Sequence, residues 1–168
     1  EEAAPLITEQ MAKAMQIKQS GIWLFEKSTL VCIDSFDTES EKHDISPEFV
    51  IADYPRYFHS ISTLPYIDAS DAQNDPRTCE FSSSYLEPGK VRGLLDVPVY
   101  LGSELVGIIC FEHSGEKRIW QADEITFACR IADHVALILA GQRRRIAEEK
   151  LRDAHSSLHN NYIFTQTL

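Results

Sequence analysis

The sequence predicts an α+β fold in which helices and loops cover a central antiparallel sheet. Two pairs of short apolar segments are each joined by a tight link, which is typical of β-hairpins. Residues 105–111 are apolar at both odd and even positions, so this strand is expected at the centre of the sheet with both of its faces covered. Helix-forming stretches stand near both ends, at residues 5–19 and from 122 to about 158.

The first third of the chain is expected to hold one helix and one hairpin. Residues 5–19 form the helix, because their large apolar side chains recur at helical spacing. These side chains are Leu6, Ile7, Met11 and Met15. Strands at 22–26 and 30–36 form the hairpin across a three-residue link. Residues 37–47 are expected to be an acidic loop.

The middle of the chain is expected to be mostly short elements. Residues 53–62 read as a short helix with Pro55 in its first turn. A short strand at 65–69 follows, then a turn-rich loop at 71–77. Residues 80–86 have room for one or two helical turns. The second hairpin, with strands at 91–101 and 105–113, comes after this region.

The C-terminal helix carries a second signal in its apolar spacing. Positions three and four residues apart form a coiled-coil-like seam. The apolar members are Ile125, Ala128, Ala132, Val135, Leu139 and Ile146. Beyond Ile146 the pattern continues in another phase through Ala147, Leu151, Ala154 and Leu158. A helix of about 37 residues is about 55 Å long, so we expect its far end to project and the terminal helices to form a parallel homodimer. The alternative is that the N-terminal helix, through Leu6, Met11 and Met15, covers the seam within one subunit.

Composition limits the classes of protein to consider. With 168 residues and a net charge of −10, the chain fits one acidic domain and lacks the basic face that nucleic-acid binding needs. No apolar run approaches the roughly 20 residues of a membrane-spanning helix, so no membrane insertion is expected. Four cysteines without CxxC spacing indicate reduced thiols and a cytoplasmic location, and the six histidines show no metal-ligand spacing. The N-terminus reads as part of a longer protein.

Several motifs between Tyr54 and Asp133 resemble those of GAF domains from bacterial signalling proteins. They are Asp75-Pro76-Arg77-Thr78, Tyr85-Leu86, Leu95-Asp96-Val97-Pro98, Leu105-Val106-Gly107, Cys110-Phe111-Glu112-His113, Asp123-Glu124 and Ile131-Ala132-Asp133. The resemblance implies a GAF/PAS-like sheet, with the terminal helices on one face and residues 50–90 covering the other. It also implies a sensory domain at 1–145. Residues 146–168 would then begin a linker helix to an output module beyond Leu168, such as a histidine kinase or diguanylate cyclase.

The resemblance further implies a small-molecule pocket between the sheet and residues 54–86. Its expected walls are aromatic: Tyr57, Phe58, Tyr66, Phe81 and Tyr85. Its floor is either Ile109 and Phe111 or, on the other parity, Ile108 and Cys110, with His113 at the end of the strand. Arg77 is either an anchor for an anionic ligand or the internal partner of Asp68, Asp71 or Asp75. The same aromatics could instead fill the space, which would leave a ligand-free dimerisation spacer.

Three more specialised activities of GAF domains fit the residues less well. Phe81 and Ser82 stand where bilin-binding relatives carry the linking Cys and its His, so no covalent bilin is expected. Glu112 and His113 replace the Asn-Lys pair of cyclic-nucleotide binders. Cys79 is the one candidate thiol for methionine sulfoxide reduction, and that family's loop motifs are absent. We therefore expect no catalytic residues, and the ligand stays unidentified.

Overall fold

The computed structural model describes residues 3–45 and 47–166, with side chains through residue 156. The chain contains two units, 1–133 and 134–168. The first unit holds a seven-stranded antiparallel sheet of order β3-β2-β1-β7-β6-β5, with β4 paired to β2. The strands are β1 Gln19–Glu26, β2 Thr29–Asp37, β3 Lys42–Asp44, β4 Glu48–Val50, β5 Ile67–Ala69, β6 Val91–Leu101 and β7 Glu104–Ser114. The α+β fold predicted from the sequence is confirmed.

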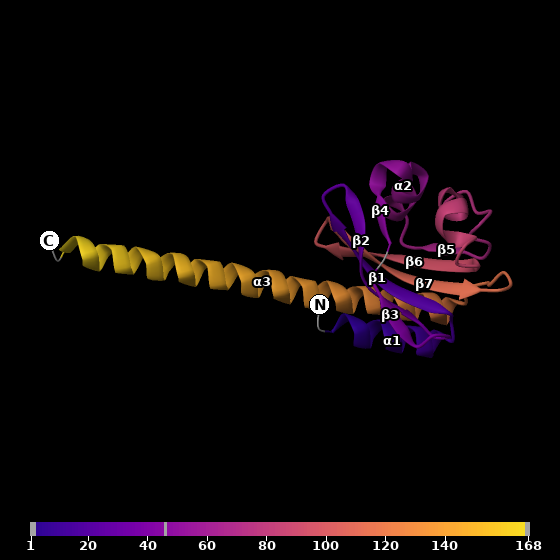
Figure 1. Ribbon diagram of the computed structural model, residues 1–168, viewed down its shortest axis with the longest axis horizontal. Helices are drawn as coiled ribbons and strands as arrows, with labels where there is room; N and C mark the ends of the chain where they lie inside the picture. The colour runs from indigo at the N-terminus through magenta and orange to yellow at the C-terminus, as the bar shows by residue number, and fades with distance from the viewer. Residues whose placement is uncertain (1–2, 46, 167–168) are drawn as a thin grey trace. The chain divides into compact units, whose positions relative to one another are not determined.

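Helices α1, α2 and the part of α3 that belongs to the first unit lie on opposite faces of this sheet. The α-helices are α1 Ala4–Met15, α2 Pro55–Thr63 and α3 Ala122–Gln166. Shorter helical turns are η1 Ile51–Asp53, η2 Cys79–Phe81 and η3 Ser82–Leu86. In Figure 1, α1 and the first turns of α3 lie on one face, while α2 and the segment between β5 and β6 lie on the other. Below, "the cover" means residues 49–86, and "the helix face" means the side of α1.

Strand β7 lies between β1 and β6, which confirms the predicted central position of the doubly apolar strand. Gly107 is needed there because a Cβ at that position would stand 2.4 Å from the backbone oxygen of Trp23 on β1. Glycine therefore allows the two central strands to approach each other closely.

Two short strands lie at and beyond the end of the predicted acidic loop, and that prediction was wrong for residues 42–44. Strand β3 pairs His43 with Phe36 of β2, and β4 pairs Phe49 with Leu30 of the same strand. All three side chains of β3 are exposed, so the strand has no apolar pattern that could reveal it. The first helix also ends earlier than expected, at Met15, because Gln16 adopts a left-handed conformation with φ of 50°.

The start of α3 carries one half of a capping box. The Glu124 carboxylate accepts a hydrogen bond of 2.8 Å from the backbone N–H of Gln121. Arg118 donates to the same carboxylate and, over 3.0 Å, to the backbone oxygen of Met15. Its guanidinium also stacks over the Trp120 ring at 4.8 Å. Arg118 thus ties the end of α1 to the start of α3.

The predicted dimer seam is partly buried within the chain. Ala128 and Ala132, which belong to the first unit, are 0% and 4% exposed, so these two side chains are not available to a second copy. Ile125 and Leu139 are half-buried, and Ile146 is exposed.

In the second unit α3 is one continuous helix to Gln166, so a boundary after residue 145 stays a prediction. Of the helices within residues 3–45 and 47–166, none has both the length and the hydrophobicity that a bilayer crossing requires.

Candidate functional site

A cavity of about 30 Å³ lies between the sheet and the cover. Its lining is Trp23, Leu30, Phe49, Tyr57, Phe81, Tyr85, Leu86, Leu94, Asp96, Ile108, Cys110 and Glu112. Tyr57, Phe81 and Tyr85 of the predicted aromatic wall are among these residues. The volume is far below the roughly 300–1,000 Å³ of sites that hold drug-sized ligands. In this conformation the cavity has room for a group of a few atoms.

The wall of the cavity is an aromatic cluster centred on Phe49. The Phe49 ring lies 5.4 Å from Trp23, 4.9 Å from Phe81 and 5.4 Å from Tyr85, and the last two contacts are edge-to-face. Sequence reasoning missed Phe49 because β4 is only three residues long, too short for an alternating pattern. Tyr54 stacks on the Phe81 ring at 4.0 Å and extends the cluster outward.

Two buried acids on neighbouring strands form the polar part of the site. The Tyr57 hydroxyl donates to Asp96 Oδ2, and the Tyr85 hydroxyl donates to Glu112 Oε1 over 2.8 Å. Cys110 Sγ also donates to Glu112 Oε1, at 3.4 Å. Asp96 and Glu112 are each only 3% exposed. Within the described part of the chain, Asp96 Oδ1 and Glu112 Oε2 have no hydrogen-bond partner.

Burial controls the protonation of this group. Desolvation raises the pKa of Asp96 to about 6, against the opposing effects of the neighbouring Cys110 thiol and Tyr57 hydroxyl. Desolvation likewise raises the pKa of Glu112 to about 7, and the nearby charge of Asp96 adds to the effect. The pKa values of Tyr57, Tyr85 and Cys110 are also raised, mainly by burial. Both acids therefore keep a proton up to a higher pH than exposed carboxyl groups do.

The register of the sheet decides the parity that the sequence left open. Ile108, Cys110 and Glu112 face the cavity. Ile109 and Phe111 point to the helix face and are fully buried there, so their placement in the pocket floor was wrong.

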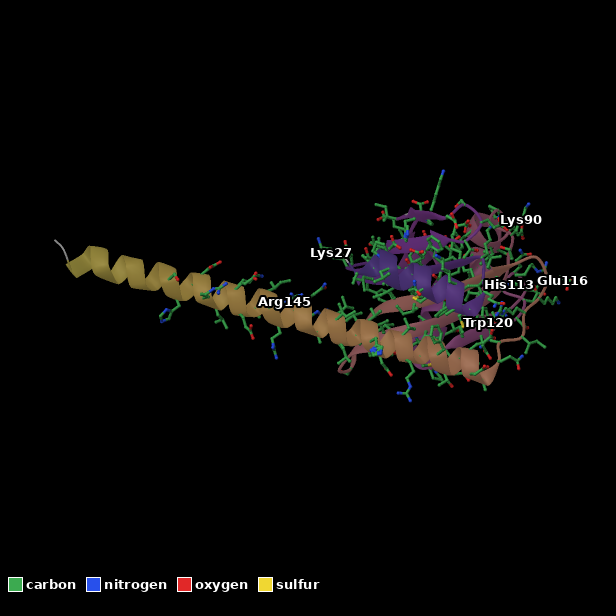
Figure 2. The ribbon with its side chains drawn as sticks, turned by 90° about the horizontal axis from the view of Figure 1, so that it is seen from below. Lys27, Lys90, His113, Glu116, Trp120 and Arg145 are labelled. Carbon is green, nitrogen blue, oxygen red and sulfur yellow. The ribbon has the colours of Figure 1, made fainter. Side chains whose placement is uncertain are left out.

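His113 was also wrongly placed in the pocket. Figure 2 shows it near Trp120, at the same end of the first unit. Its Nδ1 lies 3.4 Å from Arg118 Nη1.

Three other predicted pocket residues lie away from the cavity lining. Phe58 is buried in the same core, edge-on to Phe25 at 5.8 Å, and Tyr66 is half-buried. Arg77 forms a two-bond ion pair with Asp75, at 3.0 and 2.8 Å, and donates to Asp68 over 3.0 Å. Of the two roles considered for Arg77, the structure shows the internal partner.

The fold and the sequence place this chain in one family. The family model for the GAF domain matches residues 1–139, so the chain belongs to the GAF domain family. A comparison with curated proteins finds no match.

Solved structures with the same fold come from bacterial signalling proteins. One is the GAF domain of a phosphoenolpyruvate-protein phosphotransferase from Coxiella burnetii (TM-score 0.69, 17% identity, 87% of this chain and 85% of that chain). Another is the Thermosynechococcus elongatus PixJ GAF domain in its blue-light absorbing form (0.68, 18%, 92% and 91%). A third is the GAF domain of a two-component sensor histidine kinase from Bacillus halodurans (0.62, 17%, 83% and 95%).

Proposed function

We propose that this GAF domain is a non-catalytic sensory module whose ligand site is the cavity beneath the cover. The observation that carries the proposal is the pair of unpartnered carboxyl oxygens, of Asp96 and Glu112, buried in that cavity. Buried polar atoms in native proteins are nearly always hydrogen-bonded, so two unpartnered ones in one cavity point to a missing partner. The aromatic wall supplies apolar contact around them.

The residues of the site favour binding over covalent chemistry. A nucleophilic thiol needs a low pKa and positive charge nearby. Burial instead raises the pKa of Cys110, the one thiol in the cavity lining, and the pKa of Cys32 to about 12. We therefore propose that neither Cys110 nor Cys32 acts as a nucleophile, and that Cys79, which does not line the cavity, has no catalytic role there.

A covalent bilin does not fit this site. Phe81 fills the position of the linking cysteine, and its ring packs against Tyr54 and Tyr57 at 4.0 and 4.8 Å. Cys79 is absent from the cavity lining, and a space of about 30 Å³ is far smaller than a tetrapyrrole. This small volume also favours the second candidate function, a ligand-free dimerisation spacer.

A ligand screen separates the sensory module from the spacer. We expect ligand-observed NMR with a library of small fragments to find binders to the 168-residue chain. Cys110→Leu should fill the cavity and abolish their binding, whereas the control Ile109→Leu, on the helix face of the same strand, should retain it. A library without binders, together with no small molecule retained in native mass spectrometry of the purified chain, would favour the spacer.

We further propose that the domain is a parallel homodimer and signals through α3 to an output module. The support is an exposed apolar stripe on the second unit. Leu137 and Leu151 are 70% and 71% exposed and lie fourteen residues apart, which is two heptads. The heptad position between them is Arg144, which forms an ion pair with Glu148. Ala140, Ala147 and Ala154 lie three residues beyond positions 137, 144 and 151. We propose this stripe as an alternative to the predicted seam through Ala128, Ala132 and Val135, because Ala128 and Ala132 are buried within the first unit.

Light scattering of charged variants tests the dimer. Leu137→Glu together with Leu151→Glu should convert a dimer into a monomer, because charges would enter the stripe. Ile146→Glu is the matched control, since Ile146 is an exposed apolar residue in the originally predicted seam. A monomer for the unmutated chain would overturn the dimer, and loss of the dimer only in Ile146→Glu would restore the original seam.

A further inference from the structure

The charge of the cavity lining indicates which ligands it can hold. Two buried carboxyl groups line it, and of the described lining residues none is Lys, Arg or His. An anionic ligand would be buried beside two acids with no positive charge to balance it. A purely apolar ligand would leave Asp96 Oδ1 and Glu112 Oε2 unpartnered.

We propose that the cavity binds a small organic cation that carries N–H donors, of the amidinium, guanidinium or primary ammonium class. This inference rests on the ligand site proposed above. The bound ligand would donate hydrogen bonds to the two unpartnered oxygens, and its positive charge would lie among the aromatic rings.

The register of β6 and β7 makes the two acids a pair. Asp96 is directly opposite Cys110, and Glu112 is two residues further along β7 on the same face. Diagonal neighbours of this kind lie about 7–8 Å apart between their Cα atoms, so their side chains can reach one small group. A tyrosine of the cover holds one oxygen of each acid, which leaves the other oxygen for a ligand.

The aromatic wall suits a cation as well. Trp23, Phe49 and Phe81 line the cavity, and Phe49 lies about 5 Å from both of the other rings. Aromatic faces attract a cation within about 6 Å of the ring centroid, most strongly where water is excluded. Neither acid has a Lys or Arg within hydrogen-bond distance in the described structure, so no internal cation competes for the site.

The protonation of the acids couples binding to pH. The groups that face them are Tyr57, Tyr85 and Cys110, all with raised pKa values, and each other. Lys18 and Cys32 exert weaker electrostatic effects on Glu112 and Tyr85 respectively. A bound cation favours the charged form of both acids, so binding should release protons and should weaken as the pH falls through about 7 to 6.

Three probes of the same shape and different charge test the proposal. Acetamidinium, acetamide and acetate each have four heavy atoms and carry charges of +1, 0 and −1. With the intact 168-residue chain at about pH 8, above both raised pKa values, acetamidinium should bind saturably with a Kd of about 1 mM, which is within reach of so small a ligand. At tenfold excess over Kd it should lower the unfolding equilibrium constant about elevenfold, seen as a higher melting temperature. Amide NMR signals of β6 and β7 should shift.

Variants locate the binding. Glu112→Gln and Asp96→Asn should each weaken acetamidinium binding at least about tenfold, because each removes one charge partner. Glu116→Gln removes the same charge from an exposed position of the first unit (Figure 2), and should leave the affinity unchanged. If one acid variant fails to fold, the other variant and the probe series in the unmutated chain still show whether the acids bind the cation.

Each contrary result has a defined meaning. Equal affinity for acetamide or acetate would overturn the cation class and leave the cavity as a ligand site. Undiminished binding to both acid variants would overturn the location. No response to acetamidinium would overturn the cation proposal, and if fragments still bind in a Cys110-dependent manner, the sensory function stands. If no fragment binds either, both the cation proposal and the sensory function are overturned.

Discussion

The two faces of the sheet bury acids in different ways. On the helix face, Asp34 is 4% exposed, and its Oδ2 accepts hydrogen bonds from Thr8 and, over 2.9 Å, from His43. On the cavity face, Asp96 and Glu112 are equally buried, yet each keeps one unpartnered oxygen within the described structure. Burial alone therefore does not identify a site. A buried acceptor without a donor is the better indicator of a site, because leaving it unpaired costs about 1–3 kcal/mol unless a bound molecule supplies the donor.

The two faces also differ in how completely their apolar side chains fill space. Phe111, Ile109 and Met11 are at most 1% exposed on the helix face. The cavity face keeps about 30 Å³ open among its rings. Ile61, Leu86 and Ile108 are equally buried on the cavity face, so the two faces differ in the open space around the pair of acids.

The largest expected effect compares one phenylalanine from each face. Phe111→Ala should lower the free energy of unfolding by about 3–5 kcal/mol, because a tightly packed site cannot collapse around the lost ring. Phe81→Ala should cost less, about 2–3 kcal/mol, since the neighbouring rings can move into existing space. Urea denaturation of both variants measures the difference. Equal losses would show that the cavity face is as tightly packed as the helix face.

The next effect is a pH dependence specific to Glu112. Its folded pKa of about 7 lies above the usual value of 4.5 for a glutamate, so the folded state binds more protons between these values. Stability from this group is full below about pH 4 and is lost as the pH rises through about 7. From pH 5 to 8, Glu112→Gln should therefore gain roughly 2–3 kcal/mol relative to the unmutated chain.

The comparison with other acids sharpens this result. Glu116→Gln, at an exposed position, should show no such slope. Asp34→Asn should lower stability at pH 8 by about 1–3 kcal/mol, because it weakens an acceptor that two donors already use. Parallel stability curves for Glu112→Gln and the unmutated chain from pH 5 to 8 would contradict the assigned burial of a charge.

A smaller effect is expected for Arg77, whose partners are all internal. Arg77→Ala should lower the free energy of unfolding by about 1–2 kcal/mol, because it leaves Asp75 and Asp68 without their shared cation. Any stabilisation by a cavity ligand should be unchanged. A variant with unaltered stability and lost ligand response would instead make Arg77 an anchor, contrary to the observed ion pairs.

The smallest difference concerns thiol reactivity. Cys32 and Cys110 are buried with raised pKa values, so both should react slowly with a thiol reagent in the folded protein. Cys79 is half-buried on the cover and should react first. Timed labelling followed by peptide mass spectrometry gives the order. Early labelling of Cys110 would show that the cavity opens more readily than its packing indicates.

Apolar periodicity was enough to predict the hairpins, the central strand and the long helix. It could not reveal β3 and β4, which are three residues long and exist because β2 offers an edge to pair with. Nor could it choose the parity of β7, since a strand that is apolar on both sides shows its orientation only through its register with β1 and β6. Three residues of the cavity wall, Tyr57, Phe81 and Tyr85, were predicted because they are aromatic residues of the expected cover.

Asp96 and Glu112 were not predicted as site residues, although the sequence contains the signal that identifies them. Asp96 was read only as part of a motif and of a strand, yet it follows Leu94 and Leu95 and precedes Val97. Glu112 ends the most apolar run of the chain. A carboxylate inside a strand whose two faces are both covered has no solvent to reach. That single criterion would have found both residues.

The close contact at Gly107 has an evolutionary consequence. Any other residue there would push the Trp23 backbone, and with it one cavity wall, away from the Ile108 floor. In a relative, replacement of an aromatic residue of the cover would change the lining of the cavity and so the ligand that it prefers. A change at position 107 would instead disturb the cavity without altering any lining side chain. Substitutions that change ligand preference among relatives are therefore expected in the cover, whereas Gly107 should be retained.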